Sequence, residues 1–194
     1  MEIAVAAVPA ARKNNALKII GFSLLGLIIL LLLAIAIMFG GEIASIASVY
    51  QVGDTDLFTM AYKGDYGLEA FLQEGAASDG ELVTFISRQL LKGLPLTFDL
   101  PDLGCSTFLA QTPQGEYIFG RNFDNYDTPV LLLTTKPKNG YASISVVNLA
   151  FIGYAKDRLP DKLLSRLLLM AAPYAPLDGV NEKGLAIGVL QIDI

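Results

Sequence analysis

The sequence contains no histidine and only one cysteine, Cys105. Without an imidazole, this thiol cannot belong to a Cys-His pair in which histidine takes the proton. Without a second cysteine it cannot form an intramolecular disulfide, and one thiol without histidine makes a poor metal site. We therefore expect neither a metal nor another cofactor. Two interpretations of Cys105 stay open: a small buried apolar residue, or a nucleophile whose base is not an imidazole.

Positive charge is also scarce outside the N-terminal arm. Of the 14 lysines and arginines, three precede residue 40, whereas only one of the 19 acidic residues does. Residues 40–194 therefore carry 11 positive and 18 negative side chains, a balance of −7. An acidic segment with scattered basic residues offers no electrostatic footprint for a phosphate backbone. We exclude nucleic-acid binding.

A long apolar stretch covers residues 19–39, which contain no charged side chain. These 21 residues are long enough to cross the roughly 30 Å hydrocarbon core of a bilayer as a helix. The flanking charges are asymmetric, with Arg12, Lys13 and Lys18 before the stretch and Glu42, Asp54 and Asp56 after it. The positive-inside rule then predicts a cytoplasmic arm over 1–18, a signal-anchor helix over 19–40 and an extracellular remainder.

The alternative to an anchor is a signal peptide that is cleaved near Ser45-Ile-Ala47. The apolar stretch is longer than the usual apolar region of a signal peptide, so we favour the uncleaved anchor.

Residues 41–104 are expected to form a linker and a small helical pro-segment. A short helix is predicted over 66–75, and a second helix begins at a capping box made by Ser78 and Glu81. Its apolar residues Leu82, Phe85 and Ile86 share one face. We favour ordinary packing as the role of this helix, and shielding of the nucleophile before cleavage is the alternative.

Residues 105–194 change to the pattern of strands and turns. Thr112-Pro-Gln-Gly115 and Asn139-Gly140 each predict a hairpin. A helix is expected from Pro160 to about Met170 through Leu163, Leu164, Leu167 and Leu168. Asn181–Gly184 is predicted to be a tight turn before a last strand over 185–192, whose partners we expect outside this sequence. The pattern predicts an α+β fold, as part of a layered sandwich.

A base becomes available if the Gly104–Cys105 bond is cut. Cys105 then has a free α-amine with a pKa of roughly 7.7–8.0 in model compounds, close enough to neutral pH to accept the thiol proton. N-terminal threonine nucleophiles use the same arrangement.

The residues after Cys105 carry a specific pattern. A strand, a glycine-containing turn and Gly120-Arg121-Asn122-Phe123-Asp124 follow it, with spacings of 121 − 105 = 16 to the arginine and 124 − 105 = 19 to the aspartate. A second block reads Asp178-Gly-Val-Asn-Glu-Lys-Gly-Leu185. Together these blocks resemble the N-terminal-nucleophile amidases of the choloylglycine hydrolase family, which includes bile-salt hydrolases, penicillin V acylases and acid ceramidase.

The resemblance implies an αββα sandwich and a role for each matching residue. Cleavage between Gly104 and Cys105 frees the nucleophile, Arg121 lies near its sulfur and Asp124 binds its α-amine. Gln191 occupies the position of the oxyanion-hole side chain, where family members mostly carry Asn or Tyr; its longer amide is a departure that can still donate. We expect Asn122 and Asn181 to form turns.

The resemblance also implies an activity and a boundary. We expect a membrane-anchored amidase that cleaves an N-acyl amide, such as a conjugated bile salt, a penicillin side chain or a lipid amide. The family places another catalytic Asn and Arg further downstream, so we expect this sequence to be the N-terminal part of a longer protein. Two other readings remain: an acyltransferase of the 6-aminopenicillanic acid type, and a binding protein without catalysis. Either is compatible with an oligomer.

Overall fold

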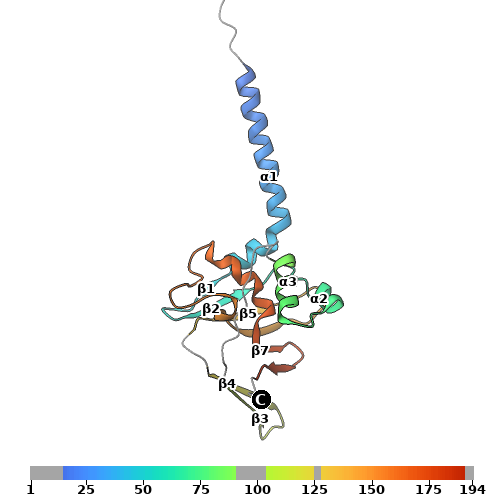
Figure 1. Cartoon of the computed structure of the whole chain (residues 1–194), viewed down its shortest axis with the longest axis vertical. Coiled ribbons are helices and arrows are strands. Elements are labelled where there is room, and N and C mark those ends of the chain that lie inside the picture. The colour runs from blue at the N-terminus through green and yellow to red at the C-terminus, as the bar shows by residue number, and fades with distance from the viewer. Residues whose placement is uncertain (1–14, 91–103, 125–127, 191–194) are drawn as a thin grey trace, which may run out of the picture. The chain divides into compact units, whose positions relative to one another are not determined.

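The computed structural model describes residues 15–90, 104–124 and 128–190 (Figure 1). The chain divides into two units, Met1–Phe39 and Gly40–Ile194. Helix α1, Asn15–Ala47, runs from the first unit into the second, and Phe39 has non-helical angles (φ −120°, ψ 15°) where the two meet. A glycine pair follows this residue, which is a common cause of a kink.

The first unit consists of the apolar part of α1. The stretch Lys18–Ala47 has a mean hydropathy of 3.0 and is long and apolar enough to cross a membrane. Its leucines, isoleucines and Phe22 are exposed, so no protein core covers this surface. The prediction of one helix with the length and composition of a membrane span is confirmed.

The second unit is built on a six-stranded sheet. Its strands lie in the order β1 (Tyr50–Gln51), β2 (Leu57–Ala61), β5 (Val130–Thr135), β6 (Ser143–Asn148), β7 (Pro176–Asn181) and β8 (Ala186–Gly188). Neighbours are antiparallel except β2 and β5, which are parallel. The Asn139-Gly140 turn joins β5 to β6 as predicted.

One face of this sheet carries the core. Strand residues Phe58, Met60, Leu131, Leu133 and Val147 are buried there. They belong to one apolar cluster with residues of α3 (Asp79–Gln89), η1 (Leu149–Ile152) and η2 (Ser165–Tyr174). On the opposite face, Ile144 and Val180 are exposed. Among the described residues, the helices therefore form a layer on one face of the sheet only.

The two helices before residue 90 begin and end close to their predicted positions. Helix α2 covers Leu68–Glu74 and α3 covers Asp79–Gln89. The Ser78 hydroxyl accepts a hydrogen bond from the Glu81 amide at 3.3 Å, as a capping box requires. The Glu81 carboxylate reaches one residue further than expected and accepts from the Ala77 amide at 2.7 Å. Phe85 and Ile86 are buried.

An aromatic cluster joins this helical layer to the end of β2. The ring centroids of Tyr62 and Tyr66 are 5.6 Å apart, and Tyr174 lies 6.1 Å from Tyr66. The Tyr174 hydroxyl donates to the Tyr66 carbonyl at 2.7 Å. Burial raises the pKa of all three phenols, because removal from water penalises the phenolate.

The second sheet is a hairpin of β3 (Gly104–Gln111) and β4 (Tyr117–Asp124). Gly115 has φ +87°, which supplies the left-handed residue that the sequence predicted for this turn. The molecule is therefore a mixed α+β protein with one long apolar N-terminal helix.

Strands β1 and β2 lie where we expected a linker. Phe58 and Met60 alternate with more exposed neighbours, as in a half-buried strand, and β2 pairs with β5 more than 70 residues away. Because this partner is distant in sequence, the short run Leu57–Ala61 gave no local signal of its pairing. Strands from residues 41–90 and strands from residues 128–190 therefore belong to one sheet.

The helix predicted from Pro160 to Met170 is wrong in type and boundary. The structure has a 3-10 helix, η2, from Ser165 to Tyr174, and Pro173 lies inside it. The Ser165 hydroxyl accepts from the Lys162 amide at 3.0 Å and donates to the Lys162 carbonyl at 2.7 Å. These local bonds close a turn where an α-helix was expected to begin.

The last predicted strand is also shorter than expected, and it has a partner. Strand β8 covers Ala186–Gly188 and pairs antiparallel with β7. We expected its partners outside this sequence, but the tight turn at Asn181–Gly184 folds it back on the strand before it. The Asn181 side-chain oxygen accepts from the amides of Lys183 (3.0 Å) and Leu185 (3.1 Å), which confirms its predicted turn-forming role.

Candidate active site around Cys105

The register of the β3–β4 hairpin brings Cys105 and Arg121 together. Cys105 lies opposite Phe123, and Thr107 lies opposite Arg121. Since alternate residues of a strand share a face, Cys105 and Arg121 are diagonal neighbours on the same face. The prediction that β4 returns beside the strand beginning at Cys105 is confirmed.

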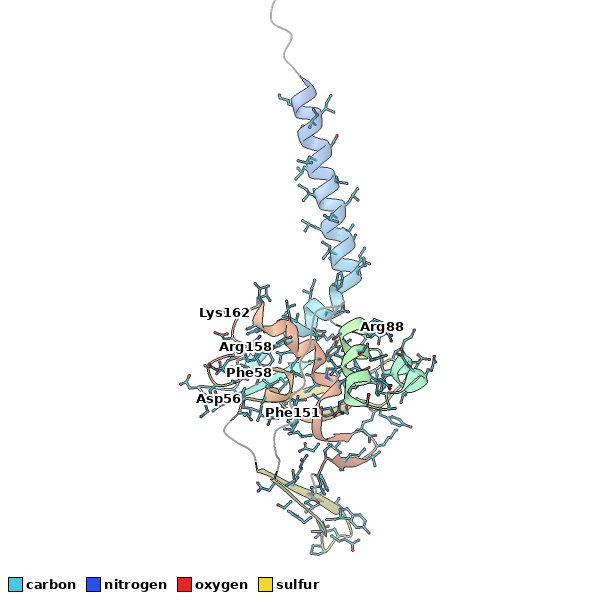
Figure 2. The ribbon with its side chains drawn as sticks, viewed as in Figure 1. Asp56, Phe58, Arg88, Phe151, Arg158 and Lys162 are labelled. Carbon is cyan, nitrogen blue, oxygen red and sulfur yellow. The ribbon has the colours of Figure 1, made fainter. Side chains whose placement is uncertain are left out.

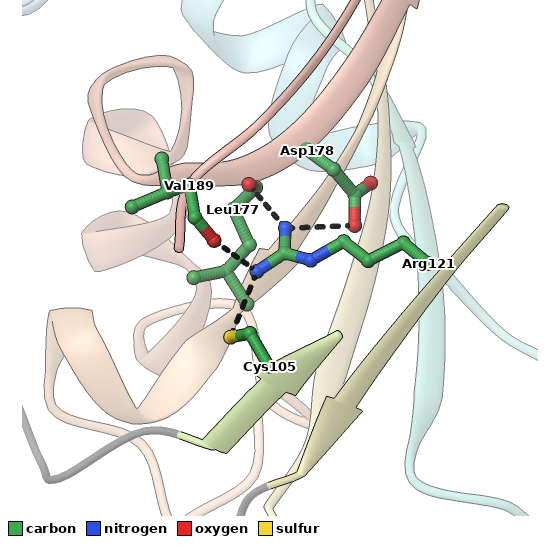
Figure 3. Close-up of polar contacts among 5 residues, drawn as sticks. All are labelled: Cys105, Arg121, Leu177, Asp178 and Val189. Carbon is green, nitrogen blue, oxygen red and sulfur yellow. Dashed lines mark hydrogen bonds and ion pairs between the residues drawn. The ribbon is translucent and has the colours of Figure 1, made fainter. Parts of the chain in front are cut away.

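The Arg121 guanidinium is the centre of a small polar cluster (Figure 3). Its Nη2 lies 3.3 Å from Cys105 Sγ and donates to the Val189 carbonyl at 2.6 Å. Its Nη1 donates to the Leu177 carbonyl and, at 3.1 Å, to Asp178 Oδ2. The guanidinium therefore connects the hairpin to β7 and to the residue after β8.

The Arg121 guanidinium needs these polar contacts because it is buried. The Arg121 side chain is 5% exposed and that of Asp178 is 23% exposed. A charge taken out of water is tolerated when an opposite charge and hydrogen-bond acceptors surround it. Asp178 and the two carbonyls provide that compensation, and they fix the direction in which Nη2 meets the sulfur.

This geometry can support negative charge on sulfur. A cationic group in contact with a cysteine stabilises its thiolate, which is the form that attacks a carbonyl. The arginine cannot act as a base, because it stays protonated at all pH values relevant to a protein. Its contribution would be electrostatic and positional.

Gly188 allows the two sheets to approach at this point. A Cβ atom there would lie 3.3 Å from Phe119 Cζ and 3.5 Å from Arg121 Cδ. The absence of a side chain lets β8 pass close to β4. The Val189 carbonyl, one residue later, can then accept from the guanidinium.

Cys105 is partly exposed and is a free thiol. Gly104, on the other side of the predicted cleavage bond, is the first residue of β3 and lies opposite Asp124 in the register. The predicted scissile bond therefore lies at the beginning of a strand. The segment before it, residues 91–103, lies outside the described residues.

The structure does not test the predicted catalytic roles, and it leaves the side chains of two of the four residues undescribed. The backbone of Asp124 ends β4, but its side chain is outside what the structure describes. Gln191 lies outside the described residues altogether. Their predicted roles stay predictions.

A cleft lies between the hairpin and the face of the six-stranded sheet that no helix covers. Its volume is about 610 Å³. Leu109, Tyr117 and Phe119 line it from the hairpin, and Val146, Asp178 and Val180 are among the residues that line it from the sheet. The walls combine apolar and polar surface, and Asp178 belongs both to the cleft and to the cluster around Arg121.

Sequence analysis did not identify Asp178 as the partner of Arg121. The residue was visible as the first member of the block 178–185, but it was given no role. The two positions are 57 residues apart, so neither spacing nor periodicity indicated the pair. A buried arginine needs a carboxylate partner, and this general rule was the only indication of the pair that the sequence offered.

In the described parts of the chain, no group of three or more His, Cys, Asp or Glu residues could hold a metal ion. No protein-family model matches the chain, and searches of curated proteins and of solved structures also find no match.

Proposed function

We propose that this chain is a membrane-anchored cysteine amidase that cleaves a linear amide of an N-acyl substrate through a thioester on Cys105. One observation carries the proposal: Arg121 Nη2 lies 3.3 Å from the only thiol of the protein. The guanidinium is nearly buried and is held by Asp178 and two carbonyls. A fixed cation beside a single cysteine is the environment of a reactive thiol.

The spacing in the resembling amidase family gives this contact further weight. A separation of 16 residues and the register of a hairpin with two eight-residue strands together make positions 105 and 121 diagonal neighbours. The layers also support the proposal: helices on one face of a sheet, and a second sheet near the other face, are compatible with an αββα sandwich.

Activation begins with the bond between Gly104 and Cys105. In this step Sγ attacks the Gly104 carbonyl, an S–C bond forms and the C–N bond breaks. Water hydrolyses the resulting thioester, which leaves a carboxylate on Gly104 and a free α-amine on Cys105. We assign the binding of this amine to Asp124, as the resemblance implies.

Catalysis then uses the same thiol. The α-amine accepts the thiol proton, the sulfur attacks the substrate carbonyl, and Gln191 donates to the developing oxyanion. The C–N bond breaks as the α-ammonium protonates the leaving amine. Water, deprotonated by the α-amine, hydrolyses the thioester and releases the acid, so that one difficult step becomes two easier ones.

The membrane part of the proposal rests on α1. Its stretch Lys18–Ala47 has the length and hydropathy of a spanning helix. We assign anchoring to residues 19–39, with the basic arm before them in the cytoplasm and the second unit outside.

The substrate class is proposed from the cleft that shares Asp178 with the cluster around Cys105 and Arg121. Its apolar wall residues and its volume of about 610 Å³ suit the acyl part of an N-acyl amide. The polar end of the substrate would lie toward Asp178 and Arg121.

Intact-mass measurement tests this function. The full chain is incubated in detergent with a panel of N-acyl amides, and the wild type should gain one acyl group that hydroxylamine removes. Cys105→Ala should gain none, and Arg121→Met should gain it much more slowly. Arg88→Met serves as the matched control, since Arg88 pairs with Glu74 on the surface.

Two results would change the proposal. The absence of any adduct in a wild-type chain that begins at Cys105 would contradict amidase chemistry and favour a binding protein. If added amines remove the acyl group from Cys105 faster than water does, the activity is acyl transfer and not hydrolysis.

A further inference from the structure

Three leucines at the beginning of η2 present their side chains to solvent. Leu163 is 70% exposed, Leu164 is 79% exposed and Leu167 is 40% exposed. A single exposed leucine is ordinary, but three within five residues form an apolar patch that water-facing surfaces rarely carry. We expected these residues to lie along an α-helix that begins at Pro160. They lie instead at a turn closed by Ser165, and their side chains are exposed.

This patch belongs to a loop that is tied to the residues following the apolar helix. Arg166 Nη1 donates to the Ile46 carbonyl at 3.5 Å, and Arg166 Nε donates to the Pro160 carbonyl at 3.1 Å. Ile46 is only seven residues after Phe39, at which the apolar part of α1 ends. At a helical rise of about 1.5 Å per residue, seven residues span about 10 Å. The loop is therefore bonded to a residue that lies only seven positions along the chain from the apolar part of α1.

The charges around the leucines differ in sign from the rest of the unit. Residues 156–166 contain Lys156, Arg158, Lys162 and Arg166 against Asp157 and Asp161, a balance of +2. Residues 40–194 as a whole have a balance of −7. Arg158 and Lys162 are exposed and are labelled on this loop in Figure 2. Cations beside exposed leucines suit a bilayer surface, where apolar side chains enter below anionic headgroups.

We propose that residues 158–167 form a membrane-contact loop. Leu163, Leu164 and Leu167 enter the interface of the bilayer, while Arg158 and Lys162 meet anionic headgroups. This inference rests on the proposed anchoring by residues 19–39 and is independent of the amidase chemistry. The loop gives the second unit a contact with lipid that does not depend on a covalent connection to the anchor.

Tryptophan fluorescence tests the proposal, because the chain contains no tryptophan. Three single-tryptophan variants of the full chain are reconstituted in phosphatidylcholine–phosphatidylglycerol vesicles, with or without brominated acyl chains. Leu164→Trp probes the loop. Leu27→Trp reports insertion of the helix, and Leu72→Trp is the exposed control on α2, where Leu72 is 75% exposed.

The expected result is strong quenching of Leu27→Trp and Leu164→Trp by brominated lipid, with no quenching of Leu72→Trp. Adding Arg158→Glu and Lys162→Glu to the Leu164→Trp chain should lower its quenching in anionic vesicles. The matched charge reversal Lys138→Glu, on the β5–β6 turn, should leave that quenching unchanged.

Each other outcome has a distinct meaning. Quenching of Leu27→Trp without quenching of Leu164→Trp would refute the membrane-contact loop and would still support the anchoring by α1. A blue-shifted but unquenched Leu164→Trp would place the loop against protein, such as a second copy of the chain, and would also overturn it. An unquenched Leu27→Trp would refute the anchoring on which the proposal rests.

Discussion

The six-stranded sheet and the β3–β4 hairpin both contain many apolar residues, yet they are held in different ways. The larger sheet buries Leu131, Leu133 and Val147 under a helical layer. The hairpin leaves Phe108, Leu109 and Ile118 exposed. The Arg121 side chain links it by polar contacts to Leu177, Asp178 and Val189 of the same unit. Apolar burial therefore fixes the first region, and a charged cluster that contains the candidate nucleophile fixes the second.

The largest difference in stability is expected when a leucine is replaced by alanine once in the larger sheet and once in the hairpin. Leu133→Ala should lower the free energy of unfolding by about 3–4 kcal/mol, because it opens a cavity in a fully buried position. Leu109→Ala, at a position that is 67% exposed, should change it by less than about 0.5 kcal/mol. Urea unfolding of the full chain in detergent compares the two. Equal losses would show that the hairpin is buried as deeply as the sheet.

A second prediction concerns the attachment of the hairpin. Arg121→Met removes the cation and leaves the Asp178 carboxylate without this partner, which should cost about 3 kcal/mol, at the lower end for a buried pair. Amide hydrogen exchange should accelerate by about a hundredfold in β3 and β4. Amides of β5 should keep their rates.

The matched control for that variant is Arg88→Met. Arg88 and Glu74 form an ion pair at 2.6 Å with both side chains at least half exposed, so its removal should cost less than about 1 kcal/mol. Comparable effects of the two substitutions would refute the role assigned to Arg121.

A third prediction tests the approach of the two sheets. Gly188→Val places methyl groups where a Cβ atom would already be 3.3 Å from Phe119, and should destabilise the cluster by about 1–3 kcal/mol. Reaction of Cys105 with a bulky thiol reagent should become faster as the hairpin separates from β8. Ala186→Val, two residues earlier on β8, is the control. An unchanged labelling rate would mean that Gly188 is not needed for the contact.

The smallest effect at neutral pH is expected in the helical layer. Burial raises the pKa of Tyr62, Tyr66 and Tyr174 above the ordinary value of 10.0, so these phenols stabilise the folded state below pH 10. Stability should fall as the pH rises above 10, because the unfolded state loses its protons first. Thermal melting against pH measures this loss.

Tyr62→Phe should reduce that alkaline loss. At neutral pH it should cost no more than about 1 kcal/mol, because the Tyr62 hydroxyl makes only a 3.4 Å bond to the Met170 carbonyl. Tyr117→Phe on the exposed hairpin is the control. A Tyr62→Phe curve that follows the wild type above pH 10 would contradict the assignment.

The comparison of regions also explains what the sequence could predict. Hairpins are local, so Gly115 indicated the β3–β4 hairpin, Asn139-Gly140 indicated the β5–β6 hairpin, and Ser78 indicated the start of α3. The family resemblance implied that Arg121 lies near the Cys105 sulfur, and the register of the β3–β4 hairpin places the two residues on one face. By contrast, the parallel pairing of β2 with β5 joins distant segments and has no local signature.

Two further features of the structure could not be predicted from composition and spacing. Leucines at helical spacing predicted an α-helix after Pro160, but the side chain of Ser165 closed a turn there and the apolar residues became a surface patch. The pairing of Arg121 with Asp178 required the position of β7 beside the hairpin. Local chemistry was predictable, whereas the long-range contacts that complete the site were not.

The most direct test of the central claim is the N-terminus of the protein made in membranes. Intact mass and N-terminal sequencing of the wild type should show a chain that begins Cys105-Ser106-Thr107, and Cys105→Ala should stay uncut. If both proteins stay uncut and begin upstream, Cys105 has no free α-amine, and the proposed mechanism is contradicted.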